Sequence, residues 1–145
     1  MELRIRLAEQ KDFNPLLGLL RQLWPDLDLD YKDLSDVYLK AVDSKAQQLI
    51  VGLVDNKVVG FCSLTIKNNL WQAGSLGHVD ELVIDKKFRG KGFGKKMIDS
   101  ITHIAKNLKC KRIELESAFH RKEAHKFYET IGFQNRAYLF SKKLI

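Results

Sequence analysis

The spacing of apolar residues predicts one strand and two helices in the first third of the chain. Every second residue from Leu3 to Leu7 is apolar, which is the period of a half-buried strand. Apolar residues then recur at three- and four-residue intervals up to Trp24, so we expect an amphipathic helix that ends at Pro25. A second helix is expected over about residues 30–43.

The middle of the chain is typical of strands. Residues 48–66 contain two β-branched runs joined by Asp55-Asn56-Lys57, which is a strong hairpin signal. A long loop over residues 67–74 then leads to a third strand over about residues 76–84.

Helical and strand patterns alternate in the rest of the chain. Residues 93–108 carry one apolar face at helical spacing, residues 111–115 favour a strand, and residues 124–131 favour a short helix that Gly132 ends. One or two closing strands are expected over residues 133–144. This order of elements predicts a mixed α/β fold built on one sheet.

Size and composition fit a single domain covering residues 1–145, because 45% hydrophobic residues can furnish one substantial core. The first thirteen residues lack the apolar run of a signal peptide, and no segment reaches the roughly 18 to 20 apolar residues that span a bilayer. We therefore expect a soluble, cytoplasmic protein without a membrane partner. Cys62 and Cys110 have no metal-binding spacing, so we expect no metal site and interpret both as buried thiols.

Positive charge is concentrated at one place in the sequence. The formal net charge of +7 attracts anions, but nucleic acid, acidic lipid and phosphorylated cofactors all fit that charge. Six basic residues surround three glycines, namely Lys86, Lys87, Arg89, Lys91, Lys95 and Lys96. A separate acidic block occupies residues 26–43.

The glycines lie in the stretch RGKGFG, residues 89–94, between a predicted strand and a predicted helix. A dinucleotide fingerprint would need glycine at Lys95 or Met97, and a P-loop would need glycine at Arg89, so neither pattern fits. Glycines allow positive φ and leave amides uncovered, and the helix that follows starts with its positive dipole end. The loop can therefore chelate a pyrophosphate, although an ordinary strand-to-helix turn is the alternative.

Two segments resemble the GNAT family of N-acetyltransferases. The loop matches the pattern [RQ]-x-x-G-x-[GA], which in that family follows a strand of the type found here at Leu82-Val83-Ile84. AHKFYETIGF, residues 124–133, is similar to the family's segment A-x-x-[FL]-Y-x-x-x-G-[FY]. The resemblance implies a GNAT-like central, mostly antiparallel sheet with a splayed strand pair, flanked by about four helices.

The resemblance also implies that acetyl-CoA binds in a gap where residues 82–84 splay from residues 111–115. The strand would pair with the pantetheine arm, and an amide near Val83 or Ile84 would stabilise the oxyanion. The cofactor-binding residues implied are Leu82, Val83, Ile84, Arg89, Gly90, Lys91, Gly92, Phe93, Gly94 and Lys95.

Arg121 departs from the family pattern, because many members carry Asn at that position, three residues before the helix alanine. The variant HRKEAHKFYE is similar to a subset that acts on small amines, including aminoalkylphosphonate and some aminoglycoside acetyltransferases. Arg121 is a candidate phosphate or cofactor contact, and a solvated arginine is the alternative.

Tyr128 lies where the family places its general acid, which protonates the departing CoA thiolate. A base must also take a proton from the acceptor ammonium, and we prefer Glu81. Asp80, His78, His120 and a water chain are the rivals. Strand alternation puts Asp80 and Glu81 on opposite faces.

The function expected is direct transfer of an acetyl group from acetyl-CoA to a primary amine, with a small molecule as the acceptor. A non-catalytic acetyl-CoA-binding regulatory domain and an enzyme acting on protein or peptide amines are the alternatives. The helix pair over residues 13–42 and the loop over residues 67–74, with Trp71, are expected to select the acceptor. The sequence leaves open which amine is the acceptor, and it leaves open whether the protein forms a homodimer. No nucleic-acid partner is expected, because the phosphates of CoA already account for the basic loop.

Overall fold

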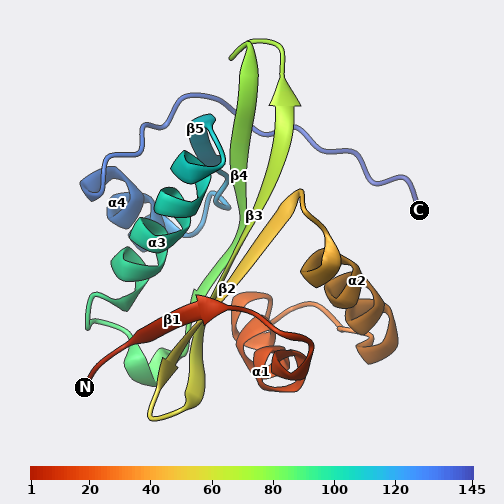
Figure 1. The fold of residues 1–145 in the computed structure, drawn as a ribbon, viewed down its shortest axis with the longest axis vertical. Coiled ribbons are helices and arrows are strands. Elements are labelled where there is room, and N and C mark those ends of the chain that lie inside the picture. Colours follow the sequence, from red (N-terminus) through yellow and green to blue (C-terminus); the bar gives the residue numbers. More distant parts are fainter.

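The computed structural model describes residues 1–145 and contains one five-stranded sheet between two helical layers (Figure 1). The strands, in spatial and sequence order, are β1 (Arg4–Leu7), β2 (Gln47–Val54), β3 (Lys57–Asn69), β4 (Gly74–Ile84) and β5 (Cys110–Leu115). Neighbours from β1 to β4 are antiparallel, and β4 and β5 are parallel. The mixed, mostly antiparallel sheet expected from the sequence is thereby confirmed.

Four α-helices cover the sheet, as expected. They are α1 (Phe13–Leu23), α2 (Tyr31–Asp43), α3 (Phe93–Asn107) and α4 (Lys122–Thr130), and two short 3-10 helices, η1 (Gln10–Asp12) and η2 (Lys86–Phe88), precede α1 and α3. Helices α1 and α2 share one apolar cluster with one sheet face, and α3 packs on the other face with α4 beside it (Figure 1). No helix is long and apolar enough to cross a membrane.

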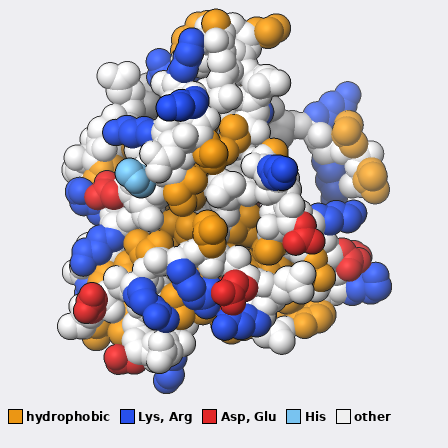
Figure 2. All heavy atoms as spheres, viewed as in Figure 1, with side chains coloured by type: hydrophobic (Ala, Val, Ile, Leu, Met, Phe, Trp, Pro, Cys, Tyr) orange, Lys and Arg blue, Asp and Glu red, His pale blue; other side chains and the backbone are white.

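The two faces of the sheet contribute alternate residues to the two clusters. Phe61 and Val83 pack with α1 and α2, whereas Cys62 and Ile84 pack with α3. In Figure 2 apolar side chains form a band through the middle of the face shown, with lysines and arginines around it. Each face of the sheet therefore packs against its own pair of helices.

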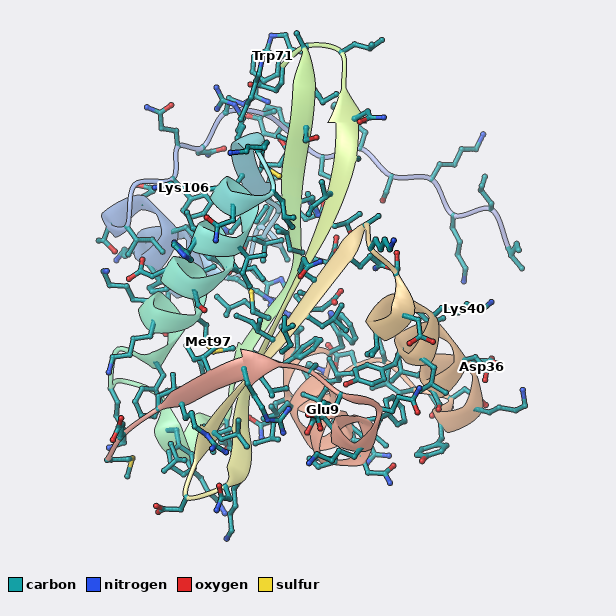
Figure 3. All side chains as sticks on the ribbon, viewed as in Figure 1. Glu9, Asp36, Lys40, Trp71, Met97 and Lys106 are labelled. Atoms are coloured by element: carbon teal, nitrogen blue, oxygen red, sulfur yellow. The ribbon has the colours of Figure 1, made fainter.

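Two glycines allow α3 to pack closely on the sheet. Gly52 and Gly60 are cross-strand partners on β2 and β3. A Cβ at Gly52 would lie 3.0 Å from Met97 Sδ and 2.9 Å from Leu3 Cδ1. Met97 is fully buried at this point, on the side of α3 that faces the sheet (Figure 3). This contact helps to fix the start of α3 beside the end of β4.

Two expectations about secondary structure are wrong. The loop expected over residues 67–74 is mostly hairpin, because β3 and β4 stay paired out to Asn69 and Gly74 and leave only residues 70–73 outside them. The closing strands expected over residues 133–144 do not form, and no backbone hydrogen bond involves residues 134–145. The strand pattern is present there, but a strand needs a neighbour to pair with.

An ion pair anchors the start of α1. Asp12 is 3% exposed, and its two carboxylate oxygens accept hydrogen bonds from Arg6 at 2.8 and 3.0 Å. The Glu9 amide donates to the same carboxylate at 2.7 Å. The guanidinium of Arg6 holds the pKa of Asp12 below its usual value of 3.8. The pair therefore joins β1 to the first turns of the helical layer.

We predict that Asp12→Ala lowers the free energy of unfolding at pH 7 by about 3 kcal/mol, because it leaves Arg6 without its partner. Since the folded-state pKa is depressed, the stabilisation is complete above the unfolded pKa and disappears as pH falls through the folded pKa. Urea unfolding at pH 7 and at acid pH measures both effects. Asp36→Ala, which removes an exposed pair with Lys32, is the control and should cost under about 0.5 kcal/mol. If the two variants lost equal amounts of unfolding free energy, the ion pair of Arg6 and Asp12 would not be the anchor of α1.

Candidate active site

Strands β4 and β5 separate partway along β4 and leave an open edge. Their pairing runs from Ser75 opposite Cys110 to Val79 opposite Leu115 and then stops. On its other edge β4 remains paired with β3 as far as Ile84. The segment from Asp80 to Ile84 therefore has free main-chain groups on the side of β5, and the splayed pair expected from the sequence is confirmed.

Strand geometry shows which main-chain groups face this gap. The Asp85 amide donates across to the Val59 carbonyl on β3 at 2.8 Å, so the Ile84 carbonyl points the other way, where Arg89 Nε donates to it at 2.9 Å. Alternation then directs the amides of Leu82 and Ile84 to the gap and that of Val83 to β3. Of the two amides suggested for the oxyanion, only that of Ile84 has the required direction.

The glycine loop has the backbone conformation that an anion site needs. Gly90 and Gly92 have φ values of 76° and 79°, and Gly92 is the N-cap of α3. The amide of Lys96 donates to the Gly92 carbonyl at 3.2 Å, which closes the first turn. The amides of the residues before Lys96 have no partner within the helix and are the free donors at the positive end of the helix dipole. These donors fit a pyrophosphate.

Other residues of the loop hold it in place. Phe93 is 3% exposed and belongs to the core, so only its amide is available to a ligand. A Cβ on Gly94 would lie 3.4 Å from the Phe127 ring of α4, so this glycine lets α4 approach α3. Lys91 is exposed, and Lys95 pairs with Asp99 at 2.7 Å. These lysine side chains thus place positive charge around the loop and leave its main-chain amides accessible.

Asp80 and Glu81 lie on the same face of the sheet, and the expectation of opposite faces is wrong. Ser63 Oγ donates to Glu81 Oε1 and Thr65 Oγ1 donates to Asp80 Oδ2, each at 2.5 Å. Ser63 and Thr65 are two residues apart on β3 and so share a face. Glu81 pairs with Ser63 and Val79 with Leu64, which leaves Asp80 as an extra residue in a β-bulge. The bulge turns both carboxylates toward α1 and α2.

This face carries two titratable groups with shifted pKa values. Burial raises the pKa of Glu81 above its usual value, and the hydrogen bond from Ser63 acts against this shift. His78 Nδ1 lies 2.8 Å from Asp80 Oδ1, and this hydrogen bond raises the pKa of His78. Glu81 is thereby made more basic, while His78 is held closer to its protonated form.

Tyr128 lies on α4, in the layer formed by α3 and α4, on the opposite side of the sheet from α1 and α2. It is half-buried on α4, with ring centroids of Phe127 and Phe133 at 5.3 and 5.7 Å, and burial raises its pKa. Its hydroxyl has no hydrogen-bond partner in the chain and is not sealed from solvent, so it is free to meet a ligand. Cys62 is completely buried, and burial raises its thiol pKa, so it serves the core rather than as a nucleophile.

The remaining candidates have other surroundings. Arg121 Nη2 donates to the Leu23 carbonyl at 2.6 Å and so links the start of α4 to the end of α1. His120 is exposed on the loop before α4. Trp71 lies at the tip of the β3–β4 hairpin (Figure 3), at the far end of the hairpin from Glu81. Any contact of Arg121 with the cofactor remains a prediction.

Ser63 and Thr65 were not singled out in the sequence. Their signal was nevertheless present, because both are polar residues alternating with apolar ones in the run FCSLTI. Ser63 is 3% exposed, and a hydroxyl at such a position needs a partner. The partner could not be identified without the register of β3 against β4.

Comparison with known proteins agrees with this geometry. The Acetyltransferase (GNAT) family profile matches residues 10–133. Glucosamine 6-phosphate N-acetyltransferase of Trypanosoma brucei brucei is 28% identical over 140 residues, 92% of this chain and 90% of the relative. Aminoalkylphosphonate N-acetyltransferase of Salmonella typhimurium is 26% identical over 140 residues, 97% of this chain and 90% of the relative. An aminoglycoside N-acetyltransferase solved in complex with CoA shares the fold, with a TM-score of 0.87 at 16% identity over 98% of this chain and 95% of that chain.

The chain therefore belongs to the GNAT acetyltransferase family, and it is an acetyl-CoA-dependent N-acetyltransferase. The open edge of β4 and the free amides at the start of α3 are the parts of this chain that fit the cosubstrate.

We predict that Gly92→Val raises KM for acetyl-CoA about tenfold or more, because a β-branched residue resists the positive φ at this position. A Cβ there would meet no atom within 4 Å, so the effect must come from the backbone and not from a clash. Initial rates at varied acetyl-CoA measure KM. Gly18→Val, the same change at an exposed glycine of α1, is the control. An unchanged KM in Gly92→Val would exclude the loop from cofactor binding.

Proposed function

We propose that the protein transfers the acetyl group of acetyl-CoA directly to a primary amine of a small molecule. The observation that carries this proposal is the position of Glu81 and Tyr128. Glu81 extends from β4 toward the α1 and α2 layer, while Tyr128 belongs to the α3 and α4 layer. The open edge of β4 lies between these layers, so a proton acceptor and a proton donor flank the place where the acyl group would lie.

Glu81 is the proposed base. An ammonium with the usual pKa near 10.4 needs about 4 to 5 kcal/mol to lose its proton at pH 7. A carboxylate with a raised pKa is better matched to accept that proton, directly or through water. Ser63 holds the Glu81 side chain in place through its hydrogen bond. Asp80 is occupied by Thr65 and His78, so it is a weaker candidate.

Tyr128 is the proposed acid. Its phenol is protonated at neutral pH, because burial raises a pKa that already lies near 10. It can donate that proton to the departing thiolate, and the free amide of Ile84 can donate to the carbonyl oxygen as negative charge develops. No covalent intermediate on the protein is needed, which agrees with the burial of Cys62.

The proposed cofactor contacts follow the order of the chain. Main-chain groups of Leu82 bind the pantetheine arm, the amide of Ile84 donates to the acyl oxygen, and the buried side chain of Val83 supports both from the core. The amides of residues 90–95 bind the pyrophosphate, and Lys91 adds positive charge. Arg89 holds the loop to Ile84, so its main effect is on the position of the loop.

A small amine is the proposed acceptor because two relatives that align over nine-tenths of their length are named for such acceptors. Thiol release from acetyl-CoA should be measured with glucosamine 6-phosphate, aminoalkylphosphonates, spermine, aminoglycosides, amino acids and peptides. We expect a small amine to give the highest kcat/KM. Preference for a peptide would overturn the acceptor class, and tight cofactor binding without any transfer would indicate a regulatory domain.

We predict that Tyr128→Phe lowers kcat about 100-fold or more, because it removes the proton donor. KM for acetyl-CoA should change little, since the ring and its packing remain. Steady-state kinetics with the best acceptor measure both constants. Tyr138→Phe, the same change at an exposed tyrosine, is the control and should leave kcat unaltered. A wild-type rate in Tyr128→Phe would assign this tyrosine to packing alone.

We predict that Glu81→Gln shifts the acidic limb of the profile of kcat/KM against pH to higher pH. The wild-type rate should fall as pH drops through the pKa of Glu81, and burial places this limb at higher pH than for an ordinary glutamate. In the variant the rate should rise with pH up to the alkaline range, because only free amine reacts. His78→Gln is the comparison, and if that variant shifted the limb while Glu81→Gln left it unchanged, the base would be His78.

A further inference from the structure

Arg121 carries a positive charge that no carboxylate of the chain neutralises. It is the N-cap residue of α4, at the position where the sequence departs from the family pattern. Its guanidinium makes one hydrogen bond, from Nη2 to the Leu23 carbonyl at 2.6 Å, and takes part in no ion pair. A guanidinium has five N–H donors, so most of those of Arg121 have no partner in the chain.

The hydrogen bond to Leu23 connects two layers of the fold at the end of β4. Leu23 is the last residue of α1, where free carbonyls and the negative end of the helix dipole favour a cation. The neighbouring Gln22 accepts from the Lys86 amide at 2.9 Å, which places this end of α1 just after the open segment of β4. Helices α1 and α4 lie on different sides of the sheet (Figure 1). The side chain of Arg121 therefore extends from one layer to the other beside the gap.

Arg121 and Tyr128 share one side of α4. They are seven residues apart, close to two full helical turns, and Ala124 lies between them at the same side. All three residues are half-buried, whereas Lys126 is exposed on another side of the helix. Ala124 contributes only a methyl group, so no bulky side chain separates the cation from the phenol on this side of α4.

Few charged or titratable groups act on the Tyr128 phenol. Burial raises its pKa, a negative charge on Cys62 of β3 would raise it further, and the charge of Arg121 lowers it. Cys62 stays a neutral thiol, because burial raises its own pKa. The neighbouring rings of Phe127 and Phe133 carry no charge. Arg121 is therefore the group among these that favours loss of the phenol proton.

We propose that Arg121 is a positioning residue for acetyl transfer, anchored on the Leu23 carbonyl so that its guanidinium holds a positive charge beside Tyr128. This inference rests on the role proposed for Tyr128 as the acid. When the C–S bond of the tetrahedral intermediate breaks, its electron pair goes to sulfur, and Tyr128 gives its proton to that sulfur and becomes a phenolate. The guanidinium stabilises the phenolate. The amine nitrogen loses two protons in all, of which one restores the phenol and the other is released to solvent.

A double-mutant cycle tests whether Arg121 acts through Tyr128. Arg121→Gln should lower kcat about tenfold, because the phenolate loses its stabilising charge, while KM for acetyl-CoA changes less than about twofold. In the Tyr128→Phe background the same substitution should have no further effect, since no phenol remains to be stabilised. Equal losses in both backgrounds would overturn the proposal. A raised KM with an unchanged kcat would also overturn it and make Arg121 a cofactor contact.

Nuclear magnetic resonance measures the effect of Arg121 without catalysis. In protein carrying ¹³C at Cζ of tyrosine, the signal that Tyr128→Phe removes belongs to Tyr128. The midpoint of its alkaline titration should lie about half a pH unit or more higher in Arg121→Gln, because a positive charge favours the phenolate. Arg121→Lys keeps the charge, so its midpoint should stay close to that of the wild type. An unchanged midpoint in Arg121→Gln would contradict the inference.

Lys126→Gln is the matched control, because it removes one positive charge from the exposed side of the same helix. It should alter neither kcat nor the titration of Tyr128. If it had the same effects as Arg121→Gln, only the net charge of the protein would matter and the proposal would fail. Failure of the acid assignment gives a different result, since Tyr128→Phe by itself would then keep the wild-type kcat.

Discussion

The parting of β4 from β5 is the constraint on which the site depends. A strand in the middle of a sheet has both edges satisfied and can offer nothing to a ligand. Here β4 remains paired with β3 as far as Ile84 and is no longer paired with β5 after Val79. The next five residues therefore have free main-chain groups on one side only. The bulge at Asp80 falls where the pairing with β5 stops. The edge of β4 thus opens, and its two carboxylates turn to one face, at the same point of the strand.

Two separate apolar clusters maintain this opening. The α1 and α2 layer packs behind the carboxylates, and the α3 layer carries the glycine loop on the opposite face. Because β2 and β3 have buried residues on both faces, neither layer can shift without disturbing the other. Arg121 adds a direct link between α4 and the end of α1. The proposed base, Glu81, therefore faces the α1 and α2 layer, while the proposed acid, Tyr128, belongs to the α3 and α4 layer. Both layers pack on the same sheet.

The C-terminal part of the molecule follows a different rule. Elements β1 to α3 bury their apolar faces within the chain, whereas β5, α4 and residues 134–145 leave theirs half-covered or exposed. Strand β5 is the last strand of the sheet and pairs with β4 only as far as Leu115, so its outer edge is not paired with another strand.

Local features of the site could be predicted from the sequence because they depend on neighbouring residues. The glycine loop, the start of α3 and the strand before it follow from contiguous residue types. The short helix that carries Tyr128 follows from the spacing of its apolar residues, whereas the role expected of Tyr128 came from the resemblance to the GNAT family. The tertiary structure decided the rest. The shared face of Asp80 and Glu81 depends on the register against β3, and the Arg121 contact joins residues 98 positions apart. The closing strands do not form, because a strand needs a neighbouring strand to pair with. Side-chain direction and strand formation depend on partners, which the order of residues alone does not specify.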